Sequence, residues 1–191
     1  MKATGELASR EAIIRYGKRM LEEGLVQGTW GNLSVRLSPV YMLTTPSGRD
    51  YNSIRADDTV KVDIKTLTHE NGKTPTSEKA MHAVIYEARE DVGAIIHTHS
   101  TYASIFAASG KPLQIMNPTL REVGGELVYI ADYGPSGSRK LAQNVIRALG
   151  PRHAVILFHH GMLAVGADIE EAFRVCRAVE QAAKEYIDAR Y

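Results

Sequence analysis

Apolar residues recur every three or four positions in several segments of the chain, a spacing that predicts amphipathic helices. The clearest of these segments is the last, where Asp168 is a typical helix cap and Glu171 completes a capping-box pattern. Near the other end of the chain, Gly24 provides the signal that commonly follows a helix C-terminus. The predicted helices cover residues 7–25, 80–88, 102–108, 139–149 and 168–187.

Other segments have the pattern of β-strands. Residues 32–37 and 60–64 alternate between apolar and polar positions, which predicts strands with one buried face. The apolar runs within residues 93–99 and 154–158 predict buried strands, and a further strand is predicted near residues 127–130. Strands interleaved with helices predict an α/β fold, and the short alternating strands argue against a purely parallel sheet. We therefore expect a three-layer αβα fold with a central, largely antiparallel or mixed sheet.

The composition is that of an ordinary globular protein, with 44% hydrophobic and 24% charged residues, and the 191 residues fit one domain, residues 1–191. The 23 basic and 22 acidic residues leave a formal net charge of +1, and no dense Lys/Arg cluster predicts a nucleic-acid or anionic-membrane partner. No apolar stretch approaches the roughly 20 residues that span a bilayer, and the first residues lack a signal-peptide apolar region. These features predict a cytoplasmic protein whose lone Cys176 is a core residue.

Two histidines at the end of a predicted buried strand give the strongest chemical signal. Residues two apart in a strand point to the same face, so His97 and His99 can reach one metal ion. The alternative is a pair of surface histidines, which the apolar first half of the strand disfavours. The pair therefore predicts a metal site.

A second buried strand also leads into histidines. Residues 154–158 are followed by His159, His160 and Gly161, which suggests a site shared with the first pair. Only one of the two histidines can face that site, because successive side chains alternate. Gly161 is expected to let the backbone turn close to a ligand.

Glu78, at an expected helix start, is the fourth candidate. The preceding Thr76 and Ser77 are suited to cap a helix, and the helix dipole favours an acid there, so a structural role alone would explain Glu78. His82, one helical turn on, could pair with Glu78 or simply pack. Three histidines and a carboxylate would close a tetrahedral metal shell, unless the carboxylate moves aside to admit substrate and acts as a base.

Together these residues resemble the class II aldolase/adducin family, and within it the branch of the L-fuculose-1-phosphate aldolases. The resemblance extends from about residue 7 to residue 187. Any one motif would be weak evidence, but five in matching order and spacing are specific. They are Gly28-Thr29-Trp30-Gly31-Asn32-Leu33-Ser34-Val35-Arg36, Thr45-Pro46-Ser47-Gly48, Pro75-Thr76-Ser77-Glu78, His97-Thr98-His99 and His160-Gly161.

The resemblance implies one zinc ion per subunit, bound by three histidines and by Glu78, which is also the catalytic base. The histidines are His97, His99 and His160, the last chosen over His159 because it directly precedes the glycine. Backbone amides freed by glycine, hydroxyls and a helix N-terminus are suitable anion donors, although turn and cap chemistry explains each segment alone. The implied contacts of the substrate phosphate are Gly31, Asn32, Ser47, Gly48, Thr76 and Ser77. The resemblance also implies a homotetramer with sites at subunit contacts.

The implied reaction is reversible aldol cleavage of a sugar phosphate, a ketose 1-phosphate similar to L-fuculose 1-phosphate, into dihydroxyacetone phosphate and a short aldehyde. Zinc would act as a Lewis acid, and Glu78, displaced from zinc, would exchange the proton on the nucleophilic carbon. Residues 117–119 stand where the branch carries a proton-donating tyrosine, and the chain ends short of the tail of longer members. The acid therefore has no assigned residue, and nearby Tyr133 is expected to be structural.

Four alternative functions are compatible with parts of this pattern. A sugar-phosphate 4-epimerase on the same scaffold is disfavoured, because the epimerases resembled here carry aspartate where Glu78 stands. A methylthioribulose-1-phosphate dehydratase is compatible with glutamate. A non-catalytic, adducin-like interaction domain would need no metal ligands, yet all four are present. A metallohydrolase is disfavoured by the anion-binding loops.

Overall fold

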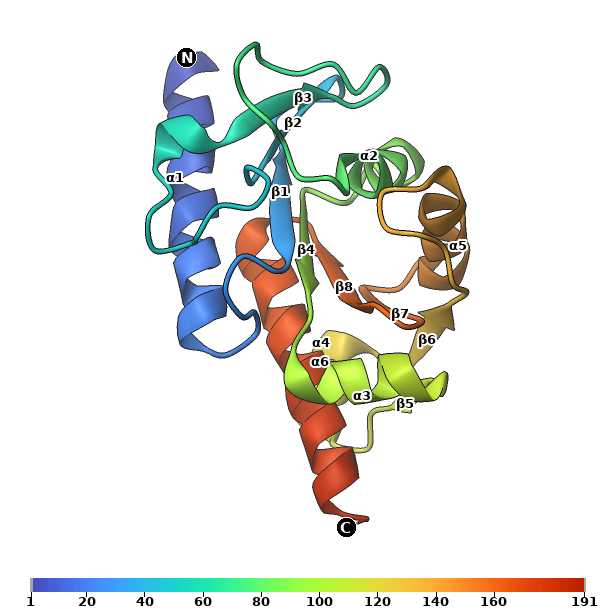
Figure 1. Cartoon of the computed structure of the whole chain (residues 1–191). Helices are drawn as coiled ribbons and strands as arrows, with labels where there is room; N and C mark the ends of the chain where they lie inside the picture. Colours follow the sequence, from blue (N-terminus) through green and yellow to red (C-terminus); the bar gives the residue numbers. More distant parts are fainter. Residues whose placement is uncertain (1, 191) are drawn as a thin grey trace.

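The middle layer of the molecule is an eight-stranded sheet (Figure 1). The structure is a computed structural model that describes residues 2–190. The strands are β1 (Asn32–Arg36), β2 (Tyr41–Thr44), β3 (Val60–Asp63), β4 (Ala94–Thr98), β5 (Leu113–Gln114), β6 (Leu127–Ala131), β7 (Ala154–Leu157) and β8 (Gly161–Gly166). They lie in the order β3-β2-β1-β4-β8-β7-β6-β5, and every neighbouring pair is antiparallel except β6 with β7. The predicted mixed, largely antiparallel sheet is confirmed.

Helices cover both faces of this sheet, as expected for an αβα fold. On one face α2 (Lys79–Ala88) packs against α5 (Arg139–Leu149), and α5 contacts β6 and β7. On the other face α1 (Lys2–Glu22), α3 (Thr101–Ser109) and α6 (Ile169–Asp188) contact the strands, and α4 (Pro118–Gly124) packs on α6. A short 3-10 helix, η1 (Ala56–Asp58), lies against α1. The sheet is therefore covered on both faces.

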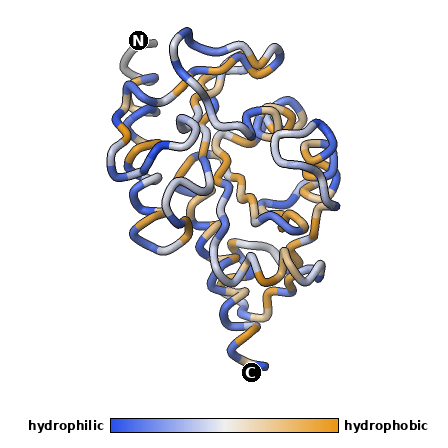
Figure 2. Tube along the Cα trace, in the orientation of Figure 1, coloured by the Kyte–Doolittle hydropathy of each residue, from blue (hydrophilic) through white to orange (hydrophobic). Residues whose placement is uncertain are grey.

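The alternation of side chains along β4 divides the apolar core between the two faces. Ile95 belongs to the cluster formed with α2 and α5, whereas Ile96 belongs to the cluster formed with α1 and α6. Apolar residues follow the strands through the centre of the molecule (Figure 2). His97 has the same parity as Ile95, so its side chain leaves the sheet on the side of α2.

The ends of the predicted helices are largely confirmed. The carboxylate of Asp168 accepts a hydrogen bond from the backbone N–H of Glu171 at 2.8 Å and caps α6. The expected reciprocal bond is displaced by one residue, because Glu171 accepts from the N–H of Ala167 at 2.7 Å. Gly24 follows the end of α1 with a φ of 69°, and Cys176 is fully buried on the apolar face of α6, as predicted.

Five elements go beyond the hydrophobic patterns, namely β2, η1, β5, α4 and β8. Four of them have only two to seven residues, too few for a period to stand out. Strand β8 is longer and wholly buried, and it starts at Gly161 immediately after the histidine doublet. None of the helices within residues 2–190 combines the length and the hydrophobicity that a membrane-spanning helix needs.

Candidate metal centre and substrate cleft

Strand β4 places two histidines on the side of the sheet that α2 covers. His97 is fully buried, and it is paired in register with Asn32 of β1 on one side and Leu163 of β8 on the other. His99 follows the end of the strand with the same parity and is half-buried. The Nε2 atoms of His97 and His99 lie 2.9 Å apart, so the two imidazoles converge on one point, as the spacing predicts.

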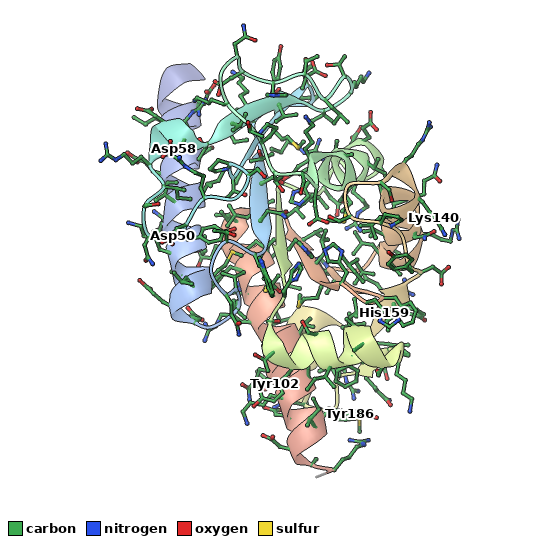
Figure 3. The ribbon with its side chains drawn as sticks, viewed as in Figure 1. Asp50, Asp58, Tyr102, Lys140, His159 and Tyr186 are labelled. Carbon is green, nitrogen blue, oxygen red and sulfur yellow. The ribbon has the colours of Figure 1, made fainter. Side chains whose placement is uncertain are left out.

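The second histidine segment turns out to be a tight turn between β7 and β8. His160 points toward the pair on β4, and its ring centroid lies 4.7 Å from that of His97 and 4.9 Å from that of His99. His159 adopts a left-handed backbone conformation with a φ of 56°, and its side chain is exposed away from the sheet centre (Figure 3). The choice of His160 over His159 therefore agrees with the geometry.

Gly161 has a packing reason to be glycine. Its Cβ, if present, would lie 2.3 Å from the carbonyl oxygen of Thr98, so glycine is required where β8 passes close to β4. This contact brings the turn that carries His160 against the end of β4, and it helps to assemble the three imidazoles.

The buried histidine is held in the tautomer that a metal ligand requires. His97 Nδ1 lies 2.8 Å from the carbonyl oxygen of Met162. Because a carbonyl can only accept, Nδ1 carries the hydrogen, and a neutral ring then presents the lone pair of Nε2 to the cluster. Burial, the dominant cause, lowers the pKa of His97 to about 4, and burial together with His160 lowers the pKa of His99. Both rings are therefore neutral at pH 7.

Glu78 precedes the first residue of α2 but does not cap the helix with its side chain. Its Oε2 lies 3.1 Å from His97 Nε2 and accepts a hydrogen bond from Asn32 Nδ2 at 3.0 Å. Its Oε1 lies 3.5 Å from His160 Nε2. Glu78 still lies at the start of α2, where the helix dipole favours an acid, but its carboxylate faces the imidazoles. The backbone N–H of Glu78 donates to Thr76 Oγ1 at 3.3 Å.

Glu78 stays ionised although it is almost completely buried. Burial by itself would raise its pKa, but the facing imidazoles of His97 and His160 and the amide of Asn32 hold the pKa below its ordinary value. A buried, ionised carboxylate beside imidazole nitrogens is an arrangement that a cation would stabilise.

The donor set fits a divalent metal ion. One nitrogen from each of His97, His99 and His160 lies within 4.8 Å of the others, and the carboxylate lies beside them. Nitrogen ligands at about 2.0–2.1 Å from one tetrahedral ion are themselves about 3.3–3.4 Å apart, a spacing that small side-chain movements reach here. Three imidazoles and one carboxylate are a combination that zinc commonly takes.

A cleft of about 360 Å³ opens beside this cluster. It is lined by all six residues that the resemblance assigns to a substrate phosphate, and also by Glu78, His99 and His160. His97 lies behind this surface, fully buried. The six come from three separate segments and are Gly31, Asn32, Ser47, Gly48, Thr76 and Ser77.

Gly31 shows why the first of these segments needs glycine. Its φ of 80° lies in the left-handed region, and a Cβ there would lie 2.6 Å from Val26 Cγ1 and 2.7 Å from the carbonyl oxygen of His97. The loop thus passes directly over the metal-site strand. This contact joins the phosphate side of the cleft to the histidine side.

Fewer backbone N–H groups are free to bind an anion in the cleft than the sequence predicts. The N–H groups of Ser47 and Thr76 donate to the carbonyl oxygens of Thr74 and Thr45, each at 3.0 Å. These two residues therefore offer a ligand their hydroxyls only. No Lys or Arg is among the cleft-lining residues of the described chain, so a bound dianion would depend on neutral donors and on the positive charge of a metal ion.

Four cleft residues have no role in the sequence interpretation, namely Thr29, Trp30, Pro46 and Ser136. Trp30 is 63% exposed at the cleft, with its ring centroid 5.9 Å from that of His99. Ser136, on the loop between β6 and α5, donates to Glu78 Oε1 at 3.0 Å. The sequence offers no clear signal for Trp30 or Ser136. Trp30 lies inside the first of the five motifs, but its apolar side chain suggests no polar contact. Ser136 lies in a Gly-Pro-Ser-Gly turn, and no sequence pattern connects this turn to Glu78.

Two other candidate positions have structural roles. His82 packs in the core, where its Nδ1 lies 2.7 Å from Ser34 Oγ, so it does not pair with the side chain of Glu78. Asn117, near the expected tyrosine position, caps α4 by accepting from the N–H groups of Thr119 and Leu120. Tyr133, the nearby tyrosine that we expect to be structural, has a side chain that is 51% exposed and does not line the cleft.

The αβα fold and a His/Glu cluster that could hold a metal ion occur together in this chain. Residues 11–187 match the family model described as Class II Aldolase and Adducin N-terminal domain, and the chain belongs to this family.

Two relatives and one solved structure are similar to this chain over most of its length. The chain is 34% identical over 182 residues to the 5-deoxy-D-ribulose 1-phosphate aldolase of Bacillus thuringiensis serovar kurstaki, covering 95% of this chain and 85% of the relative. It is 33% identical over 180 residues to the 5-methylthioribulose-1-phosphate/5-deoxyribulose-1-phosphate aldolase of Rhodospirillum rubrum, covering 94% and 80%. A solved structure of an L-fuculose 1-phosphate aldolase has a TM-score of 0.91 and 38% identity, over 96% of this chain and 86% of that one.

Proposed function

We propose that this protein is a zinc-dependent class II aldolase that reversibly cleaves a ketose 1-phosphate into dihydroxyacetone phosphate and a short aldehyde. The observation that carries the proposal is the convergence of two residue sets on one cleft. Glu78, His99 and His160 line one side of it with His97 buried behind them, and hydroxyls and glycines suited to a phosphate line the other side. The relatives named above, all aldolases of ketose 1-phosphates, support the same reaction.

The substrates named for these relatives share a feature that narrows the proposal. Deoxyribulose, methylthioribulose and fuculose 1-phosphates all end in an apolar group, a methyl or a methylthio carbon. Cleavage between C3 and C4 of 5-deoxyribulose 1-phosphate yields dihydroxyacetone phosphate and acetaldehyde. We therefore propose a deoxy or methylthio ketose 1-phosphate as the substrate class, with acetaldehyde or a similarly small aldehyde as the second product.

Each part of the cleft has a proposed task. Ser47, Thr76 and Ser77 donate their hydroxyls to the phosphate, and His97, His99 and His160 hold the cation together with Glu78. A bound divalent cation supplies Lewis acidity that stabilises negative charge on the substrate oxygens. When the C3–C4 bond breaks, its electron pair remains on C3, and the carboxyl group of Glu78 delivers a proton there. The C4 hydroxyl gives its proton to solvent water as the aldehyde forms, and the Glu78 carboxylate takes up a proton from solvent before the next cleavage.

A direct assay tests the proposal. The zinc-loaded protein is incubated with 5-deoxyribulose 1-phosphate or L-fuculose 1-phosphate, and dihydroxyacetone phosphate is measured with a coupled glycerol-phosphate dehydrogenase. Condensation of dihydroxyacetone phosphate with acetaldehyde or lactaldehyde tests the reverse direction. We expect turnover by the native chain and a loss of at least about 1,000-fold in Glu78→Gln, which keeps the shape of the residue but cannot transfer the proton.

The alternatives appear as different outcomes of the same assay. Turnover no higher than that of Glu78→Gln in both directions contradicts the aldolase assignment. Loss of water from methylthioribulose 1-phosphate, without dihydroxyacetone phosphate, identifies a dehydratase. A purified protein that binds no divalent ion supports an interaction domain.

The proposal includes the homotetramer that the family resemblance implies. A tetramer would have a mass of about 84 kDa, four times the 21.0 kDa of one chain. Light scattering coupled to size-exclusion chromatography measures this mass directly, and a monomer at 21.0 kDa contradicts the expectation.

A further inference from the structure

The two oxygens of the Glu78 carboxylate have different surroundings. Oε2 faces inward, where it accepts from Asn32 Nδ2 and lies 3.1 Å from His97 Nε2. Oε1 faces the cleft, where it accepts from Ser136 Oγ at 3.0 Å and lies 3.5 Å from His160 Nε2. Among the described residues, Ser136 is the only hydroxyl that bonds this carboxylate. A substrate approaching through the cleft therefore meets Oε1 and Ser136 first.

The loop that carries Ser136 is fixed at both ends. At its start, Asn144 Nδ2 donates to the carbonyl oxygens of Asp132 and Tyr133 at 3.1 and 3.3 Å. At its end, Ser138 caps α5 by accepting from the N–H of Leu141 at 3.1 Å. The hydroxyl of Ser136 is thus held in place by the loop, although the residue is exposed to the cleft.

The middle of this loop packs on the segment that leads to Glu78. A Cβ at Gly137 would lie 3.0 Å from the carbonyl oxygen of Ser77, so the two backbones are close. Ser136 and Glu78 consequently approach each other from two backbones in contact, and a bond between an exposed hydroxyl and a buried carboxylate becomes possible. In the proposed function this carboxylate leaves its metal-site position in order to transfer a proton, and Ser136 lies beside it.

We propose that Ser136 is a positioning residue for Glu78, whose hydroxyl holds Oε1 on the cleft side while this carboxylate exchanges a proton with the substrate carbon. The inference rests on the proposed function. Asn32 cannot replace Ser136 in this role, because it bonds the inner oxygen and is itself buried. A hydrogen bond to a charged group is stronger than a neutral one, so a single serine suffices to bias the carboxylate between two positions.

Hydrogen–deuterium exchange on dihydroxyacetone phosphate isolates this step without any aldehyde. Glu78 takes a proton from the hydroxymethyl carbon, the C–H electron pair moves into the enediolate, and a deuteron from solvent returns to the carbon. Proton NMR in D₂O follows the loss of the C–H signal. We expect zinc-loaded Ser136→Ala to exchange about tenfold more slowly at saturating substrate, with the KM for dihydroxyacetone phosphate changed less than about twofold. Ser136→Thr, which retains the hydroxyl, should stay within about threefold of the native rate.

Zinc affinity gives the readout that separates positioning from metal binding. Competition with a chelator should show an unchanged or higher affinity in Ser136→Ala, because the carboxylate loses a donor that competes with the cation. The matched control is Ser53→Ala, which removes an exposed hydroxyl that bonds the carbonyl oxygen of Asp50 outside the cleft lining. Ser53→Ala should change neither the exchange rate nor the zinc affinity.

Two results overturn the positioning role. The first is exchange at the native rate in Ser136→Ala. The second is a zinc affinity that falls in the same proportion as the exchange rate, because the serine then supports the metal site. Failure of the native chain in both exchange and cleavage removes the aldolase function, and the inference with it. Native turnover together with an unaffected Ser136→Ala removes the positioning role alone.

Discussion

The histidine side and the loop side of the cleft are built differently. His97 lies on the central strand β4, is fully buried, and is flanked by β1 and β8 in register. Ser47, Ser77 and Ser136 lie on connecting segments and are exposed. The metal side is therefore positioned by the core of the protein, whereas the loop side depends on the connecting segments that carry these serines. Substitutions should accordingly remove metal binding on one side and tune substrate handling on the other.

The largest expected effect comes from removing a ligand on the rigid side. His97→Ala should lower zinc affinity by more than the about 10–100-fold that is typical of losing an outer partner of a metal ligand. Metal analysis after dialysis measures the effect. The matched control is His159→Ala in the same turn as His160, because His159 is exposed and away from the cluster. Equal zinc content in both variants would contradict the ligand set.

A smaller effect is expected on the loop side. Ser77→Ala removes a hydroxyl that we assign to the phosphate, and it should raise the KM for the ketose 1-phosphate about tenfold, because a hydrogen bond to a charged group is lost. Its kcat and its zinc content should change little, since Ser77 lies outside the histidine cluster. Steady-state kinetics give both parameters. A fall in kcat with an unchanged KM would place the phosphate elsewhere.

The buried side should also make folding sensitive to acid. Burial lowers the pKa of His82 to about 3, while the unfolded chain has the ordinary value of about 6.5. Between these values the unfolded state binds a proton that the folded state does not, so stability is lost as the pH falls from about 6.5 toward 3. One such group contributes at most about 1.4 kcal/mol per pH unit.

Variants of His82 test this dependence. In His82→Gln the free energy of unfolding of the metal-free protein should fall less steeply between pH 6.5 and 5 than in the native chain. Urea titrations at several pH values measure the slope, and His153→Gln, an exposed histidine, is the matched control. An identical slope in His82→Gln and the native chain would contradict the prediction.

The smallest expected effect concerns the rim of the cleft. Trp30→Ala should lower kcat/KM for a deoxy ketose 1-phosphate about threefold, because an exposed aromatic ring offers the apolar end of the sugar a contact of limited area. A hydroxylated analogue should lose less. Equal losses for both substrates would show that Trp30 does not discriminate between them.

The same contrast explains what the sequence can and cannot predict. The period of two places His97 and His99 on one face, and the period of a helix defines α6, because both follow from repeated burial. No such repetition marks α4 or β5, which are too short. The contact of Gly161 with Thr98 cannot be predicted from the sequence, because it arises only when β8 lies beside β4. Ser136 lies 58 positions from Glu78, and only the fold brings the two together.

The central claim is that His97, His99, His160 and Glu78 bind one divalent cation, and X-ray absorption at the zinc edge tests it most directly. The zinc-loaded protein should give a first shell of three nitrogens and one or two oxygens at about 2.0–2.2 Å, with the outer-shell scattering of imidazole rings. The same spectrum from His159→Ala should be unchanged. A first shell of oxygens alone, or a protein that retains no zinc, would contradict the account.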